Sequence, residues 1–142
     1  MPSRSDPHLP APTGAAPMPG PRLDESPAQL DCGDRRVQVL LAMPLPRMVL
    51  LGKLLSDEEC DALIAAARPR MARSLTVDTR TGGEELHHDR TSNGMFFERG
   101  ESPLIQRIEE RIARLLHWPV ENGEGLQVLH YRPGAEYKPH YD

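Results

Sequence analysis

Residues 126–142 have the sequence LQVLHYRPGAEYKPHYD, in which two extended runs flank a turn signal. Its first part, Leu126–Tyr131, is rich in aliphatic and aromatic residues, which favours a β-strand. The next part, Arg132–Glu136, contains Pro-Gly and is typical of a tight turn, after which Tyr137–Asp142 resumes an extended run. Pro139 cannot donate a ladder hydrogen bond, so we expect the second run at an edge, a bulge or the mouth of a cavity.

Two metal-binding residue types lie in the second run, at His140 and Asp142. Because side chains alternate along a strand, His140 and Asp142 share one face. An imidazole and a carboxylate placed in this way are two of the three ligands of a 2-His-1-carboxylate iron site, which leaves three iron positions open. A second His-x-Asp, at His87 and Asp89, lies in a polar stretch with glycines and no strand alternation, and we expect a solvated loop there.

Residues 126–142 resemble the catalytic core of the prolyl 4-hydroxylases, a family of iron(II)- and 2-oxoglutarate-dependent oxygenases, because the Tyr, Gly, His and Asp residues fall at that family's spacing. Leu54–Ile64 resembles the family's first helix, and Arg90–Gly94 resembles the segment before its next strand. The resemblance covers about residues 48–142. It implies an α+β fold: the N-terminal part of a double-stranded β-helix (jelly-roll, cupin-like) domain, with supporting helices and an incomplete core.

The resemblance also implies a set of cofactors and the residues that hold them. His140 and Asp142 match two iron ligands, and Tyr131 matches a tyrosine that hydrogen-bonds the 2-oxoglutarate carboxylate. The implied cofactors are Fe(2+), 2-oxoglutarate as co-substrate and L-ascorbate. The family's second histidine ligand and the lysine that pairs with 2-oxoglutarate come tens of residues after this motif, so we expect the chain as given to be truncated and inactive.

On the substrate side, Tyr137 matches a tyrosine near the substrate proline and is the catalytic candidate, while Arg90 and Ser92 match a loop that holds the peptide. The implied partner is a proline-containing peptide or protein. Alternatives stay open: Tyr131 and Tyr137 also suit a core-filling role, and burial would in any case require the Tyr131 hydroxyl to find a hydrogen-bond partner. A non-catalytic binding fragment that kept the oxygenase scaffold, or a cupin-type isomerase, would use the same fold without 2-oxoglutarate.

Composition divides the chain into two parts. The length of 142 residues predicts one domain, yet the apolar content of 38% and aromatic content of 4% are low for a compact fold. Ten of the 15 prolines fall within residues 1–46. We therefore expect residues 1–36 to form a disordered, proline-rich tail and residues 37–142 to form the portion of the oxygenase domain. Neither a signal peptide nor a membrane-spanning run is expected from the sequence.

Charge and cysteine content narrow the functional classes. A net charge of −4 and a pI near 5.9 argue against a nucleic-acid-binding surface. The two cysteines, Cys32 and Cys60, lack CxxC spacing, which argues against a zinc site and a disulfide and fits a cytoplasmic location. Nothing in the sequence indicates the oligomeric state.

Two helices are expected from their start signals. Ser56 is a suitable N-cap, Glu59 completes a capping box, and Pro69 stops the first helix. Because Glu59 reaches an exposed donor, we expect Glu59→Ala to destabilise less than Ser56→Ala. The second helix begins at Ser102 and Pro103, and its buried stripe consists of Ile105, Ile108, Ile112 and Leu115.

Overall fold

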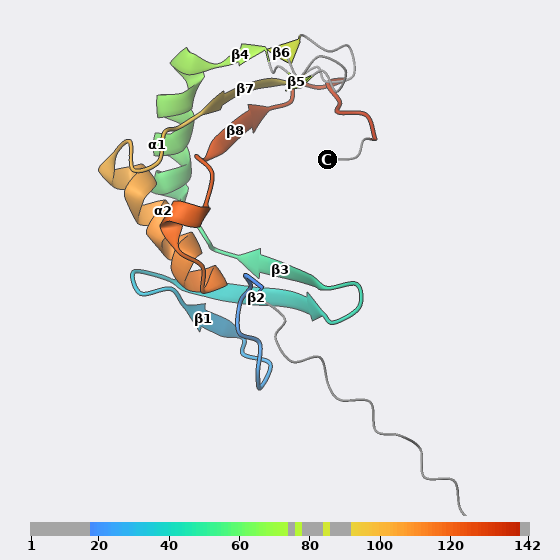
Figure 1. The fold of residues 1–142 in the computed structure, drawn as a ribbon, viewed down its shortest axis with the longest axis vertical. Helices are drawn as coiled ribbons and strands as arrows, with labels where there is room; N and C mark the ends of the chain where they lie inside the picture. Colours follow the sequence, from blue (N-terminus) through green and yellow to red (C-terminus); the bar gives the residue numbers. More distant parts are fainter. Residues whose placement is uncertain (1–17, 74–75, 78–83, 86–91, 140–142) are drawn as a thin grey trace, which may run out of the picture.

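A computed structural model of the chain describes residues 18–73, 76–77, 84–85 and 92–139. The elements in chain order are β1 (Gln29–Asp31), β2 (Arg36–Met43), β3 (Met48–Gly52), α1 (Asp57–Ala67), the 3-10 helix η1 (Arg68–Arg70), β4 (Ala72–Arg73), β5 (Thr76–Val77), β6 (Glu84–Glu85), β7 (Asn93–Phe96), α2 (Pro103–Leu116), the 3-10 helix η2 (Val120–Asn122) and β8 (Gln127–His130). Figure 1 shows two sheets at opposite ends of a helical layer, which gives the ribbon the outline of an open C.

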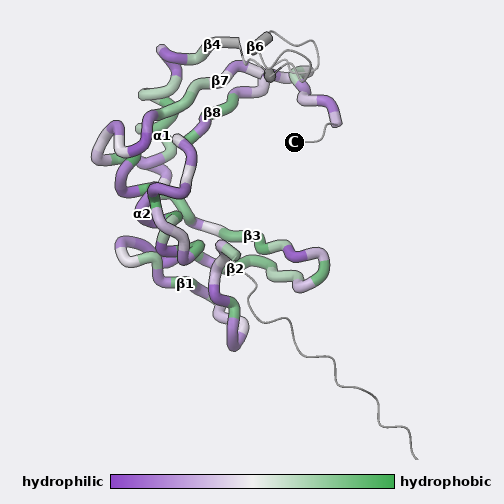
Figure 2. The backbone as a smooth tube through the Cα atoms, in the orientation of Figure 1, coloured by the Kyte–Doolittle hydropathy of each residue, from purple (hydrophilic) through white to green (hydrophobic). Residues whose placement is uncertain are grey.

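The first sheet is an antiparallel meander in the order β1-β2-β3. Its register pairs Asp31 with Arg36 and Met43 with Met48, and a bulge lies between Val39 and Leu41 in β2. The tube of Figure 2 is coloured as hydrophobic along β3 and much of β2. Part of this apolar surface is open to solvent, most clearly at the residues Leu40, Leu41, Leu45, Met48 and Leu50.

The folded part of the chain begins earlier than composition predicts. Strand β1 lies within the expected tail, and Cys32 directly after it is fully buried beside Val37 and Leu115. The boundary at residue 36 is therefore wrong for residues 29–36. Composition misses this strand because its order depends on pairing with β2 and on contacts with α2, more than 70 residues later. Residues 1–17 lie outside the described residues.

The second sheet is antiparallel and has the order β4-β7-β8, so β8 forms one edge. The pairing of β7 with β8 runs from Asn93 opposite His130 to Phe96 opposite Gln127. Strands β5 and β6 form a separate two-stranded ribbon. The strand expected from Leu126–Tyr131 is confirmed as β8, and the mixture of helices with antiparallel strands confirms the α+β class.

Helix α1 begins as its sequence predicts. The Ser56 hydroxyl accepts a 3.1 Å hydrogen bond from the Glu59 backbone N–H, and the Glu59 carboxylate accepts a 2.9 Å bond from the Ser56 N–H. The helix ends at Ala67, and the next three residues, which include Pro69, form the 3-10 helix η1. The capping box and the stop signal are both confirmed.

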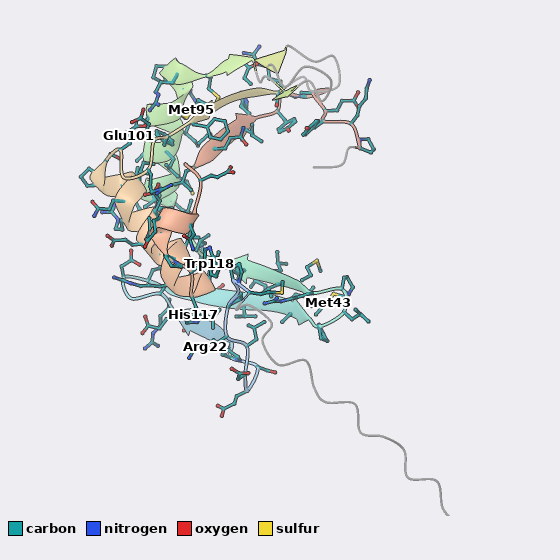
Figure 3. The ribbon with its side chains drawn as sticks, viewed as in Figure 1. Arg22, Met43, Met95, Glu101, His117 and Trp118 are labelled. Carbon is teal, nitrogen blue, oxygen red and sulfur yellow. The ribbon has the colours of Figure 1, made fainter. Side chains whose placement is uncertain are left out.

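Helix α2 also has the expected start, with Ser102 as N-cap and Pro103 in its first turn. It ends at Leu116, and the C-cap residue His117 has a left-handed φ of 50°. The Trp118 N–H donates a 3.0 Å hydrogen bond to the Ala113 carbonyl, which closes the last turn. Three members of the expected stripe are buried, while Ile112 is only partly buried. Figure 3 shows Glu101 ahead of this helix and His117 with Trp118 at its other end.

Two apolar clusters form the core, and α2 contributes to both. One lies against the second sheet and contains the buried residues Ala67, Met95, Phe97 and Ile105. The other lies against the first sheet and contains Cys32, Val37 and Leu115. Ile105 and Leu115 are ten positions apart on the same helix, so α2 connects the two sheets. Among the described residues, no helix is long and apolar enough to cross a membrane.

A buried arginine lies between the two clusters. The Arg111 side chain is only 3% exposed and donates hydrogen bonds of 2.7 Å to Asp34 Oδ2 and to Glu59 Oε1. It also donates a 2.6 Å bond to the Leu54 carbonyl. The guanidinium lowers the pKa of Glu59 to about 2 and also lowers the pKa of Asp34, because each carboxylate accepts its hydrogen bonds. This network joins α2, the start of α1 and the β1–β2 turn.

Replacing Arg111 with methionine should destabilise the fold by about 3 kcal/mol, because it leaves two carboxylates without their cation and one of them is nearly buried. Urea unfolding followed by circular dichroism measures this. The matched control is Arg107→Met on the same helix: Arg107 is half exposed and reaches the same Glu59 at 3.4 Å, so its loss should cost under about 1 kcal/mol. Equal effects for the two variants would contradict the assigned role of Arg111.

The capping box allows a second comparison. Ser56→Ala should cost about 1 kcal/mol through loss of one cap bond. Glu59→Ala should cost more, about 3 kcal/mol, because Glu59 also binds Arg111. The order expected from sequence is thus reversed by a contact 52 positions away along the chain. Thermal unfolding of both variants decides the order, and a larger loss for Ser56→Ala would restore the original expectation.

Acid should weaken this network in a defined window. The pKa of Glu59 is about 2 in the folded chain, against an ordinary value of 4.5. A depressed folded pKa gives stability that is present above pH 4.5 and is lost as the pH falls toward 2, because the unfolded chain takes up the proton first. The loss should reach about 3 kcal/mol in urea titrations across this range. Glu59→Gln should flatten most of the slope, and an unchanged slope would contradict the assignment.

Candidate active site

The site expected from sequence is built around the turn that follows β8. The Ala135 N–H donates a 2.8 Å bond to the Arg132 carbonyl, which closes a four-residue turn. Pro133 occupies its second position, and Gly134 occupies its third with a φ of +83°. These features define a type II turn, where a residue with a Cβ would be strained at the glycine position. The predicted turn is confirmed and directly follows β8.

The strand register brings two of the predicted site residues to one end of the second sheet. Asn93 pairs with His130, and the next positions outward are Ser92 on one strand and Tyr131 on the other. Ser92 is fully buried, whereas Tyr131 is 40% exposed. Ser92 was expected to hold substrate and Tyr131 to hold 2-oxoglutarate. The register brings both residues to the same end of the sheet, and their roles stay predictions.

The remaining predicted residues follow the turn or lie outside the described part. Tyr137 is half-buried and forms an isolated β-bridge, which agrees with the extended run expected after the turn. The iron-ligand candidates His140 and Asp142 and the substrate candidate Arg90 lie outside the described residues, as does the second His-x-Asp motif at His87. The roles of all these residues stay predictions. Across the described ranges, no three His, Cys, Asp or Glu side chains come together as a metal-binding group.

A second arginine fixes β7 against the helices. Arg70 donates a 2.9 Å hydrogen bond to the Phe96 carbonyl at the end of β7, and its guanidinium lies 5.2 Å from the centre of the Phe97 ring. Arg70 also pairs with Glu101, whose pKa it lowers through that hydrogen bond. These contacts hold the strand that carries Ser92 at its far end.

An apolar pocket of about 380 Å³ lies along the edge strand β8. Helix α1 and η1 contribute Ile64 and Arg68, and β8 contributes Leu129 and His130. Sequence reasoning missed this pocket, because no local pattern marks a cavity between elements some 60 positions apart. Among the described strands β8 lies at an edge of its sheet, so the pocket adjoins a sheet edge.

Comparison with curated proteins identifies relatives of this chain. The chain is 47% identical over 110 residues to prolyl 4-hydroxylase 5 of Arabidopsis thaliana, an alignment that covers 78% of the chain and 37% of the relative. It is 46% identical over 110 residues to probable prolyl 4-hydroxylase 3 of the same plant, with 78% and 38% covered. It is 50% identical over 99 residues to prolyl 4-hydroxylase 1, again from Arabidopsis, with 68% and 35% covered. A scan against models of protein families finds no match.

The described residues form an α+β fold of helices and antiparallel strands. The chain belongs to a prolyl 4-hydroxylase-like family, as the resemblance of residues 126–142 implied. It spans less than two fifths of the length of these relatives.

Proposed function

We propose that this chain supplies the N-terminal portion of an iron(II)- and 2-oxoglutarate-dependent dioxygenase that hydroxylates a peptidyl proline or a similar substrate. The observation that carries the proposal is the 47% identity to a prolyl 4-hydroxylase over a stretch of 110 residues. The strand register is compatible with it, since Ser92, a substrate candidate, and Tyr131, a cofactor candidate, lie at the same end of the second sheet.

Each candidate residue has a role in this proposal that suits its chemistry. His140 and Asp142 would hold the iron through an imidazole nitrogen and a carboxylate oxygen. The Tyr131 hydroxyl would donate a hydrogen bond to a 2-oxoglutarate carboxylate. When bound, the iron with 2-oxoglutarate and dioxygen would supply the oxidising chemistry that hydroxylates a C–H bond, with L-ascorbate as reductant.

The substrate would be bound on the other side of this site. Tyr137 would lie against the proline ring, while Arg90 and Ser92 would hold the peptide in one orientation. Ser92 is buried directly before β7, next to a residue that the second sheet pairs with His130. Precise orientation of the reacting bond is the protein's main contribution in this kind of chemistry.

The open edge of β8 supports the jelly-roll part of the proposal. A further strand that paired with β8 would place its side chains over the apolar pocket and cover Leu129, which is 37% exposed. The exposed apolar residues of β2 and β3 provide a similar surface on the first sheet. Additional strands of an oxygenase core would bury both surfaces. The cytoplasmic location expected from cysteine content stays a prediction.

Succinate release with a proline-containing peptide tests the proposed activity. The 142-residue chain alone should bind iron weakly and show no coupled turnover, since two ligands hold ferrous iron less tightly than three. A chimera of this chain with the C-terminal portion of prolyl 4-hydroxylase 5 from Arabidopsis thaliana should be active. In that chimera His140→Ala or Asp142→Ala should reduce turnover to background.

The matched control is His87→Ala, which removes the first residue of the other His-x-Asp motif and should leave turnover nearly intact. Robust turnover by the 142-residue chain alone would contradict the proposal that further segments complete the site. A chimera that folds and lacks turnover would instead favour the non-catalytic binding function.

A further inference from the structure

A buried carboxylate on α2 has one oxygen without a partner. Glu109 is only 8% exposed, and its Oε2 accepts a 2.9 Å hydrogen bond from the Gly100 N–H. Its Oε1 is buried and accepts no hydrogen bond from any of the described residues. A buried acceptor without a donor is destabilising, more so when it is charged, so a group that donates to Oε1 would bind favourably.

The same carboxylate lines a small pocket between α2 and the loop that leads to β8. The pocket has a volume of about 100 Å³, and most of its wall is apolar, with Ile112, Leu116 and the Trp118 ring among the lining residues. Its ten lining residues include two carboxylates, Glu109 and Glu124, and no basic side chain. Figure 3 shows Trp118 at the C-terminal end of α2. Leu126 also lines the pocket, at the opposite end of β8 from Tyr131, so the pocket is separate from the candidate active site.

We propose that this pocket binds an alkylammonium group, with the ammonium donating to Glu109 Oε1 and the alkyl chain lying against Ile112, Leu116 and Trp118. A carboxylate provides the charge complement, an apolar wall suits the methylene chain, and an aromatic ring attracts a cation at its face. The small volume limits the ligand to a short chain, such as a free alkylamine or a single lysine side chain. This inference does not depend on the proposed oxygenase function.

The chain offers a direct probe for this pocket, because Trp118 is its only tryptophan. Titration of the full 142-residue chain with n-butylammonium should give a saturable change in tryptophan fluorescence. n-Butanol, which has the same chain length and no charge, should give a much weaker response. Nα-acetyl-lysine amide then separates the two sources: a response to it points to a lysine side chain, and a response to n-butylammonium alone points to a free amine.

Glu109→Gln should weaken binding of n-butylammonium by at least about tenfold, because it removes the charge from the acceptor. Its amide oxygen can still accept from the Gly100 N–H, which preserves the existing bond. The matched control is Glu110→Gln on the neighbouring position of α2, which is outside the pocket lining and accepts from Gln106. Its affinity should be unchanged.

A second variant covers the case in which Glu109→Gln fails to fold. Ala113→Leu keeps the helix propensity of α2 and narrows the pocket, so it should abolish the fluorescence change while Glu109 remains. Circular dichroism checks that each variant is folded. The proposal is overturned by the absence of a saturable change in the wild-type chain, by an equal response to n-butanol, or by full binding in either folded variant.

Discussion

The guanidinium of Arg111 connects three segments that are far apart in the sequence. It binds Asp34 between β1 and β2, Glu59 in the first turn of α1, and the Leu54 carbonyl before that helix. Helix α2 contributes a residue to each apolar cluster, Ile105 before this arginine and Leu115 after it. The hydrogen bonds of Arg111 therefore help to set the position of the helix against the first sheet. Five donors in a planar fork suit this task, because they satisfy two carboxylates and a carbonyl together.

The position of α2 in turn governs the candidate site. Ile105 packs against Met95 and Phe97 at one end of β7, where Arg70 also binds the Phe96 carbonyl. Strand β7 pairs with β8, and the register of this pairing places Ser92 and Tyr131 at the same end of the second sheet. The hydrogen-bond network of Arg111 is thus connected to the candidate site through α2, β7 and β8.

Local signals predicted several parts of this structure well. The helix starts at Ser56 and Ser102 and the turn at Pro133-Gly134 each depend on bonds within a few residues, so their sequence contains the necessary information. The tail boundary failed for the opposite reason. Cys32 is buried by residues from β2 and α2. The composition of the surrounding proline-rich segment contains no information about these distant contacts.

The family could be predicted from the spacing of Tyr, Gly, His and Asp in residues 126–142, and the helix starts from their capping residues. Three features depend on tertiary packing: Glu59 binds Arg111 as well as its helix cap, Ser92 and Tyr131 lie at the same end of the second sheet, and Glu109 lines a pocket with one oxygen that accepts no hydrogen bond from the described residues. The physical reason is the separation along the chain between the residues that interact. Caps and turns are set by bonds between near neighbours, whereas buried ion pairs, strand registers and cavities depend on which distant segments pack together.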